Sequence, residues 1–211
     1  MMYFVKAPWW LKKLYPSFIW KVPTKEKVLY LTFDDGPHET ATPFVLDELK
    51  KYEAKATFFC IGKNVTSLPS VYKRMLDEGH TAGNHTYNHL NGWKTDDTTY
   101  ISNIVQAAAL IKSNLFRPPY GRIKKFQSKL LMRKEDASQL PFKIVMWDVL
   151  SGDFDVQLSP QQCLSNVLKH TEKGSIIVFH DSTKAWSRMS YTLPRVLEHY
   201  SKEGYIFKAL E

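Results

Sequence analysis

The sequence has few of the features that mark disulfide-rich, membrane-spanning or multidomain proteins. Its 211 residues include two cysteines, Cys60 and Cys163, which are too few for a disulfide framework and form no CxxC metal-binding pair. No apolar run approaches the ~18–20 residues that span a bilayer. Glycine-, serine- or proline-rich linkers, internal repeats and low-complexity tracts are also missing. We therefore expect one folded domain, residues 25–211, preceded by a distinct segment, residues 1–24.

The charges are unequal in number. There are 29 lysines and arginines against 21 aspartates and glutamates, which gives a formal net charge of +8. Such an excess favours acidic partners such as nucleic acid, anionic lipid or an anionic polymer. Because no nucleic-acid-binding module is recognisable and the excess is spread over several segments, we expect no nucleic-acid partner. Hydrophobic residues at 44% and charged residues at 24% are ordinary for globular proteins and exclude a disordered chain.

The first 24 residues combine aromatic and basic side chains. Lys6, Lys12 and Lys13 are interspersed with Trp9 and Trp10. The longest uncharged stretch is too short and too interrupted for the apolar core of a signal peptide, which needs ~7–15 residues. Residues 1–20 could rest on a membrane surface, or they could pack against the domain or cap a barrel end, which we favour. Without an evident signal peptide, the sequence favours a cytoplasmic or peripheral membrane location.

Strand-like and helix-like segments alternate along the chain. The apolar patterns predict strands at 28–33, 56–61, 80–84, 143–147 and 175–179. They predict helices at 42–52, 71–79, 97–115, 160–170 and 193–201. This alternation is typical of parallel βα units with the helices outside. Polar residues follow several of these strands, and carboxyl strand ends form the active face of such barrels, so the placement indicates an enzyme.

Two adjacent carboxylates, Asp34 and Asp35, follow the first predicted strand and precede Gly36-Pro37. Inside a strand they would point to opposite faces, but at its end both can reach one pocket. Two carboxylates this close repel each other unless a cation neutralises one of them. A metal on one, with the other acting as a base, would relieve the repulsion. The alternative is an Asp-Gly turn with solvated carboxylates.

His85 and His89 are four residues apart and can bind one ion where the segment is helical or tightly turned. Together with Asp35 they would form a set of two histidines and one carboxylate, with positions left for water and substrate. These ligand types fit zinc, although the same set also serves ferrous oxygenases.

Two further segments carry candidate catalytic groups. In residues 117–121, two prolines hold the N–H groups of Tyr120 and Gly121 in fixed directions, which suits an oxyanion that develops during carbonyl attack. A rigid surface turn is the alternative. His180 follows four apolar residues at a predicted strand tip. A carboxylate beside it would hold its tautomer and raise its pKa, as a general acid requires, and Asp153 is the candidate.

Taken in order, these segments resemble the five motifs of the polysaccharide deacetylase family, the NodB-homology domain of carbohydrate esterase family 4. Residues 32–37 match TFDDGP, residues 85–89 match H(S/T)xxH and residues 117–121 match RPPYG. Residues 148–154 approximate DxxSxDW with Phe154 in place of the tryptophan, and Val178 replaces leucine in the LxH motif. The resemblance implies an α/β fold, a distorted (β/α)7 barrel, and metal-dependent removal of acetyl groups from a glycan.

The resemblance also implies a role for each matching residue. Asp34 would be the base and pair with Arg117, and His180 would be the acid, oriented by Asp153. The residues expected to bind a divalent metal, most simply zinc with cobalt, nickel or manganese as alternatives, are Asp35, His85 and His89. The Tyr120 N–H would receive the oxyanion. The residues expected to contact substrate are Pro119, Tyr120, Phe154 and Val178.

The expected function is removal of N-acetyl groups from an N-acetylglucosamine-containing polysaccharide, such as peptidoglycan or a chitin-like oligomer, by a monomer. An O-acetyl esterase is the nearest alternative, because ester and amide share the same tetrahedral chemistry. The net charge alternatively suggests a non-catalytic binder of anionic polymer, and the metal set a ferrous oxygenase. A basic cluster after the 117–121 turn could be a solvated helix face or could draw an anionic glycan to the cleft: Arg122, Lys124, Lys125, Lys129, Arg133 and Lys134.

Overall fold

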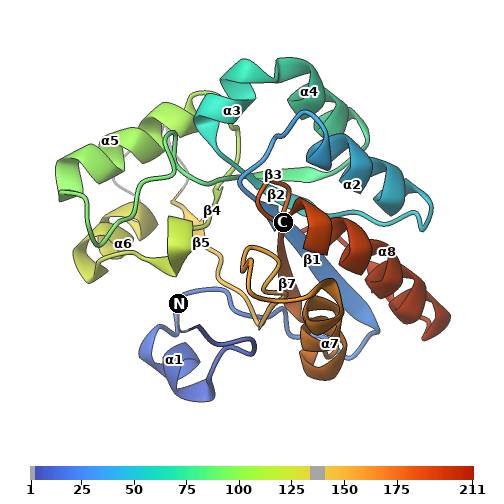
Figure 1. Cartoon of the computed structure of the whole chain (residues 1–211). Coiled ribbons are helices and arrows are strands. Elements are labelled where there is room, and N and C mark those ends of the chain that lie inside the picture. The colour runs from blue at the N-terminus through green and yellow to red at the C-terminus, as the bar shows by residue number, and fades with distance from the viewer. Residues whose placement is uncertain (1–2, 134–140) are drawn as a thin grey trace.

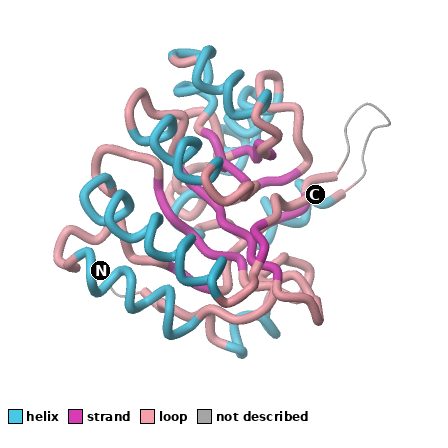
Figure 2. The backbone as a smooth tube through the Cα atoms, turned by 90° about the vertical axis from the view of Figure 1, so that its right-hand side faces the viewer, coloured by secondary structure: helices cyan, strands magenta, loops and turns pink. Residues whose placement is uncertain are grey.

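A computed structural model describes residues 3–133 and 141–211 of the chain. Lys134, the last member of the basic cluster, lies outside the described residues. A curved parallel sheet forms the interior, and helices surround it (Figures 1 and 2). None of the described helices is both long enough and apolar enough to cross a bilayer.

Short strands and longer helices alternate along the described chain. The strands are β1 (Val28–Asp34), β2 (Thr57–Cys60), β3 (Thr81–Asn84), β4 (Leu115–Phe116), β5 (Lys143–Ile144), β6 (Val149–Leu150), β7 (Ile176–His180) and β8 (Ile206–Phe207). The helices are α1 (Trp9–Leu14), α2 (Ala41–Lys50), α3 (Gly62–Ser67), α4 (Pro69–Asp77), α5 (Asp97–Ala108), α6 (Lys125–Met132), α7 (Pro160–His170) and α8 (Trp186–Lys202), with a 3₁₀ turn at Pro119–Gly121.

The sheet is an open barrel of parallel strands. Its order is β5-β4-β3-β2-β1-β7-β6, and each neighbouring pair on this path is parallel. The short β8 pairs separately with the first residues of β1. Parallel strands joined by outer helices place all carboxyl strand ends at one end of the barrel. This is the distorted barrel that the sequence predicts.

β1 is the central strand and is buried on both faces, which explains its near-continuous apolar run. Leu29, Leu31 and Phe33 are fully buried. The Phe33 ring stacks on Phe58 of β2 and Phe179 of β7, with centroids 5.0 and 5.8 Å apart. Close packing of this kind resists small displacements, so β1 and its neighbours form a rigid base for the residues at their ends.

Two helices differ from their predicted bounds. α5 ends at Ala108 rather than at residue 115, because Leu115 and Phe116 form β4 beside β3. α8 begins at Trp186 rather than at residue 193 and continues through Pro194, with Met189 and Leu193 fully buried. The helix α3 and the strands β4 and β6 were not predicted, since segments of two to six residues are too short to show a periodic pattern.

The N-terminal segment packs against the open side of the barrel. Lys6 bridges to Val149 of β6, and Ile19 bridges to Val145 directly after β5. The segment therefore spans the two ends of the sheet, which do not pair with each other in the described chain. Ala7, Phe18 and Trp20 are buried in a cluster with residues from α5, β4, α6, β5 and the loops beside them: Tyr100, Ile104, Phe116, Ile123, Leu131, Ile144 and Met146.

A buried carboxylate fixes this segment. Asp148 is completely buried, and its two oxygens accept bonds from Lys6 at 2.7 Å and Lys12 at 2.6 Å. Ser175, just before β7, donates to the same carboxylate at 2.6 Å. Hydrogen bonds to a charged group are among the strongest side-chain interactions, and here they lower the pKa of Asp148 against the opposing effect of burial. Asp148 therefore links the N-terminal segment to two strands.

We expect Asp148→Asn to lower the free energy of unfolding by about 2 kcal/mol, because two charge-assisted bonds lose their anion. It should also speed proteolysis within residues 3–20. Chemical denaturation and limited proteolysis measure the two effects. The control is Asp77→Asn, which removes an exposed ion pair with Lys73 and should change stability by less than about 0.5 kcal/mol. Equal effects of the two substitutions would contradict this account of Asp148.

Candidate active site

The structure gathers the predicted site residues at the carboxyl end of the barrel. Asp34 ends β1 and His180 ends β7, and the two are direct neighbours in the parallel register of these strands. The remaining residues follow β1, β3, β4 or β6: Asp35, His85, His89, Arg117, Tyr120 and Asp153. Residues more than 140 positions apart thus meet because parallel strands end together.

Asp35, His85 and His89 form one compact cluster. Their candidate ligand atoms all lie within 4.8 Å of one another. Asp35 Oδ1 lies 3.1 Å from His89 Nε2 and 3.7 Å from His85 Nε2. That oxygen is buried and makes no hydrogen bond of acceptable geometry. An unsatisfied buried carboxylate oxygen facing two imidazole nitrogens fits a divalent cation of the zinc type.

The protonation of His85 suits a metal ligand. Its Nδ1 lies 2.7 Å from the Arg117 carbonyl, which can only accept, so Nδ1 carries the proton and Nε2 has a free lone pair. Burial lowers the pKa of His85 to about 4, so the ring is neutral at pH 7. Burial raises the pKa of Asp35, but its contact with His89 and the charge of His180 outweigh burial and hold that pKa below the ordinary range. The cluster therefore offers a cation the Asp35 carboxylate and the neutral Nε2 of His85.

Backbone strain is concentrated around this cluster. Asp35, Thr86, His89 and Tyr120 have φ values of 81°, 64°, 57° and 60°, in the left-handed region that is costly for residues with a Cβ. Among the described residues, the only other non-glycine with positive φ is Glu53. Strained residues persist where the surroundings over-determine them, which is common at functional sites. These left-handed conformations orient the four residues around the same cluster.

Arg117 holds Asp34 in place. The guanidinium is fully buried and donates to Asp34 Oδ1 at 2.7 Å and to Thr32 Oγ1 at 2.7 Å. It also donates to the carbonyls of Val145 and Met146 and lies 4.0 Å from the Phe59 ring centroid. A buried ion pair with all its donors satisfied has a fixed geometry. Among the described residues, nothing donates to Asp34 Oδ2, which remains able to accept.

His180 pairs with Asp153. Asp153 Oδ1 lies 2.8 Å from His180 Nδ1, and Asp153 Oδ2 accepts from the His180 backbone N–H at 2.7 Å. Burial alone would lower the pKa of His180, but the charge and hydrogen bond of Asp153 outweigh it and raise the pKa to about 9. The imidazolium is therefore the dominant form at neutral pH, with Nδ1 committed to Asp153 and Nε2 available as a proton donor.

The turn after β4 offers one backbone donor, not two. Gly121 N–H bonds to the Pro118 carbonyl at 2.9 Å and so is used within the turn. In the described chain the Tyr120 N–H has no such acceptor. The Tyr120 side chain is exposed, and its ring packs edge-on against His89 with centroids 4.6 Å apart. Of the two N–H groups that the prolines orient, only that of Tyr120 is free to receive an oxyanion.

Of the four predicted substrate-contacting residues, one is exposed, one is half-buried and two are buried. Tyr120 is exposed beside His89, and Phe154 is half-buried with its ring centroid 5.2 Å from that of His180. Pro119 is buried, and Val178 is only 1% exposed because it lies in β7 between Thr32 and Leu150. Pro119 and Val178 therefore offer substrate almost no surface, in contrast to the prediction, and instead pack beneath Tyr120 and His180.

Two residues near the site were not predicted. Tyr3 packs on Phe154 with centroids 5.1 Å apart and donates to Asp155 at 3.0 Å, so the N-terminal segment reaches the cleft wall. Asp181 is fully buried beneath the loop that carries Asp35, where Thr42 donates to it. Burial raises the pKa of Asp181 to about 8, which keeps a third carboxyl beside Asp34 and Asp35 mostly uncharged at pH 7. The available sequence signal for Asp181 was its position directly after His180.

Comparison with known proteins agrees with this geometry. A sequence model of the family described as polysaccharide deacetylase matches residues 21–138. A peptidoglycan-N-acetylglucosamine deacetylase of Bacillus cereus is 34% identical over 204 residues, which cover 93% of each chain. The peptidoglycan-N-acetylmuramic acid deacetylase PdaA of Bacillus subtilis is 32% identical over 89% of this chain and 72% of its own length.

Solved structures agree on the fold as well. The crystal structure of the Bc1960 peptidoglycan N-acetylglucosamine deacetylase, in complex with 4-naphthalen-1-yl-N-oxidanyl-benzamide, superposes with a TM-score of 0.83. It is 31% identical and covers 97% of this chain and 95% of its own. The peptidoglycan deacetylase PdaC of Bacillus subtilis has a TM-score of 0.76 at 28% identity, with 90% of each chain covered.

We expect His89→Ala to weaken zinc binding by more than about 100-fold, because loss of an outer hydrogen-bonding partner alone costs 10–100-fold. Isothermal titration of the metal-free protein with zinc measures the affinity. The control is His38→Ala, which removes a histidine three residues after Asp35 that contacts Thr183 and lies outside the cluster. Equal zinc affinity in wild type and His89→Ala would contradict the assigned site.

Proposed function

The chain belongs to the polysaccharide deacetylase family, and we propose that it removes the N-acetyl group of N-acetylglucosamine in peptidoglycan with a divalent metal, an aspartate base and a histidine acid. The observation that carries this proposal is the arrangement of Asp34 and His180 on neighbouring strand ends beside the Asp35–His85–His89 cluster. Base, acid and metal ligands thus converge on one point of the cleft, as hydrolysis of an amide requires.

Asp35, His85 and His89 would hold the divalent cation. When bound, the cation would supply Lewis-acid chemistry, polarising the acetyl carbonyl and making water acidic at neutral pH. His85 contributes neutral Nε2 because the Arg117 carbonyl holds its Nδ1 proton. The set leaves coordination positions open, which is the arrangement of catalytic rather than structural zinc sites.

Asp34 acts as the general base. Arg117 donates to its Oδ1 and holds the carboxylate in one orientation, while Oδ2 accepts the proton of the attacking water. When water attacks the acetyl carbon, the carbonyl oxygen becomes an oxyanion, which is stabilised by the Tyr120 N–H that the two prolines and the left-handed turn hold in a fixed direction. Neither group has to reorganise during the reaction.

His180 donates a proton to the departing amine through Nε2. An amide nitrogen leaves poorly unless it is protonated, so a histidine that stays protonated to about pH 9 matches an N-acetyl substrate. An ester leaves more readily without a proton, and this is why we prefer N-deacetylation to the O-acetyl alternative. Phe154 and Tyr120 flank the acid and the oxyanion donor and provide aromatic walls for a sugar ring.

The substrate proposal follows from the relatives. Those that cover nearly all of this chain include peptidoglycan-N-acetylglucosamine deacetylases, and the Bacillus cereus protein has almost the same length. Peptidoglycan is an anionic polymer in many cell walls, which is compatible with a net charge of +8. Basic residues that directly follow the Tyr120 turn, such as Arg122 and Lys125, would attract it.

We expect the zinc- or cobalt-loaded protein to release acetate from N-acetylglucosamine oligomers and peptidoglycan fragments. Asp34→Asn should lower kcat at least about 100-fold, the usual contribution of a general base, with unchanged zinc affinity. Asp47→Asn, which removes an exposed carboxylate that pairs with Arg74, serves as the matched control. No acetate from any N-acetylated glycan by the metal-loaded protein would overturn the proposal, and acetate from O-acetylated glycans alone would favour the esterase.

The pH dependence tests the acid. His180 has a raised pKa, so its protonated form persists until the pH rises to about 9, and kcat should fall above that value. Asp153→Asn removes the carboxylate that raises this pKa, so the alkaline limb should move toward the ordinary histidine value, ~6.5. A pH–rate profile of both proteins measures the shift. An alkaline limb that stays in place in Asp153→Asn would contradict the pairing.

A further inference from the structure

The outer face of α1 exposes large apolar side chains. Trp9 is 70% exposed and Leu14 63%, while Trp10 and the nearby Phe4 are about half exposed at 48% and 54%. Soluble proteins rarely gather several such residues without a partner. We define these residues, together with Lys13, as the α1 surface.

Internal contacts make the α1 surface a single unit. Phe4 packs edge-on against Trp10 with centroids 6.2 Å apart, and Lys13 Nζ lies 5.0 Å above the Trp9 ring. The opposite side of α1 is fixed to the barrel. Leu11 packs on the buried cluster that contains Phe18 and Trp20, and Lys12 pairs with the buried Asp148. The exposed residues therefore project outward from a rigid support.

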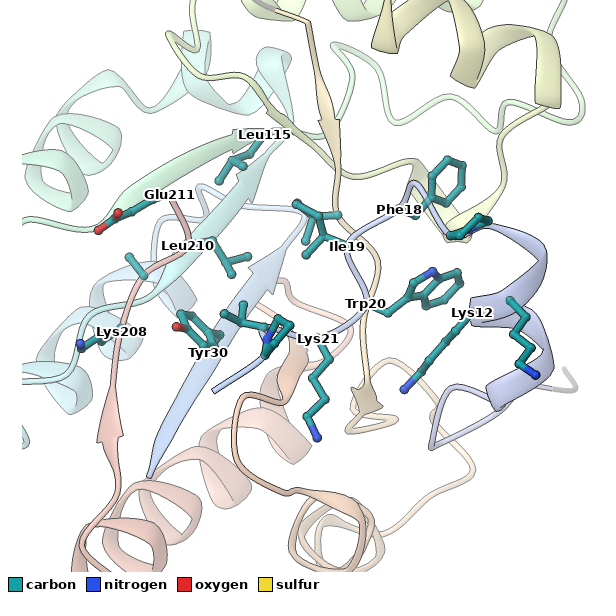
Figure 3. Close-up of a pocket in the computed structure, with 16 residues that line it drawn as sticks. Lys12, Phe18, Ile19, Trp20, Lys21, Tyr30, Leu115, Lys208, Leu210 and Glu211 are labelled. Carbon is teal, nitrogen blue, oxygen red and sulfur yellow. The ribbon is translucent and has the colours of Figure 1, made fainter. Parts of the chain in front are cut away.

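A basic pocket adjoins the α1 surface. This pocket has a volume of about 930 Å³ and an apolar floor that includes Ile19, Tyr30 and Leu210. Figure 3 shows Lys12 and Lys21 of the N-terminal segment and Lys208 of the chain after β8 around it, and Lys13 also lines it.

The charge of this pocket is mainly positive. Lys12 and Lys21 are neutralised by Asp148 and Glu172, while Lys13 and Lys208 make no ion pair in the described chain. Glu211 is the one carboxylate among the lining residues. The side of the molecule that carries exposed tryptophans thus also carries unpaired cationic groups.

The pocket lies toward the amino ends of the strands. Tyr30, which lines the pocket, is four residues before Asp34 on β1, a separation of about 13 Å along a strand. Lys12 of α1 reaches Asp148, whose carboxylate also binds Ser175 at the amino end of β7.

We propose that the α1 surface binds an anionic lipid bilayer, with Trp9, Trp10, Phe4 and Leu14 in the interfacial region and Lys13 and Lys208 near the phosphate groups. Tryptophan is favoured at the membrane–water interface because its ring is amphipathic. Lysines close to an anionic leaflet add electrostatic attraction. The bilayer would hold the enzyme peripherally.

A bilayer fits these residues better than a glycan chain. Three of the four apolar side chains project from the helix α1 and Phe4 lies beside them, whereas small-molecule sites are concave and enclose most of their ligand. Insertion of isolated aromatic and aliphatic side chains requires no such cleft. The separate cationic groups match the phosphates of anionic lipid rather than any single ligand.

Vesicle sedimentation tests the proposal with the full chain. Wild type should sediment with vesicles of equal phosphatidylglycerol and phosphatidylcholine in 0.1 M salt, and at least tenfold less with phosphatidylcholine alone. Trp9→Ala/Trp10→Ala should lower the partition coefficient on the anionic vesicles at least tenfold. Trp93→Ala is the matched control, because it removes a tryptophan of similar exposure from the loop before α5, and it should change binding less than twofold.

A charge reversal tests the electrostatic part. Lys13→Glu/Lys208→Glu should lower binding to the anionic vesicles at least tenfold. Lys63→Glu/Lys125→Glu makes the same change in net charge at the first turns of α3 and α6, on the cleft side, and should have less than a threefold effect. Equal losses in the two charge variants would indicate attraction by net charge alone and would overturn the proposal. Wild-type binding by the double tryptophan variant would overturn it as well.

The test is independent of the proposed deacetylation. Trp9, Trp10, Lys13 and Lys208 are exposed and make no contact with Asp34 or His180 in the described chain, so the variants of these four residues should keep the wild-type melting temperature. They should also keep the wild-type rate of acetate release from soluble oligomers. Absence of vesicle binding by wild type would therefore overturn the membrane proposal alone, whatever the outcome of the deacetylase assay.

Discussion

The buried side chain of Arg117 is the interaction on which the candidate active site depends. Its guanidinium fixes Asp34 from below, and its carbonyl holds the Nδ1 proton of His85. The base and one metal ligand are therefore oriented by a single residue at the end of β4. Arg117 is itself held by Thr32 and by two carbonyls after β5, so strands β1, β4 and β5 all contribute to one network. A charge this deeply buried is tolerated because every part of it has a partner.

The site is rigid beneath and strained at its rim. Phenylalanine rings of β1, β2 and β7 pack directly under the strand ends, while Asp35, His89 and Tyr120 adopt left-handed backbone conformations above them. Each such residue costs of order 1–3 kcal/mol, which the packed sheet has to offset. The result is a cluster whose groups are aimed before substrate arrives, and preorganised groups lose little free energy to reorientation during reaction.

The sequence predicts the parts of this molecule that depend on local patterns. The apolar run of β1 and the polar residues directly after strands were sufficient to predict a parallel barrel with Asp34, Asp35, His85 and His180 at one end. Other features depend on contacts that no local pattern encodes. Tyr3 reaches Phe154 across about 150 positions, and Asp148 binds Lys6 and Lys12 rather than any cleft residue. The use of Gly121 N–H inside its own turn likewise appears only once the backbone is folded.

Gly36, between Asp35 and the buried Asp181, has a consequence for how this loop can change over evolutionary time. A Cβ at Gly36 would overlap the Asp181 carboxylate, which Thr42 of α2 also contacts. A substitution at Gly36 therefore requires the buried Asp181 side chain to move. Variation directly beside Asp35 is thereby constrained by a residue that lies 145 positions further along the chain.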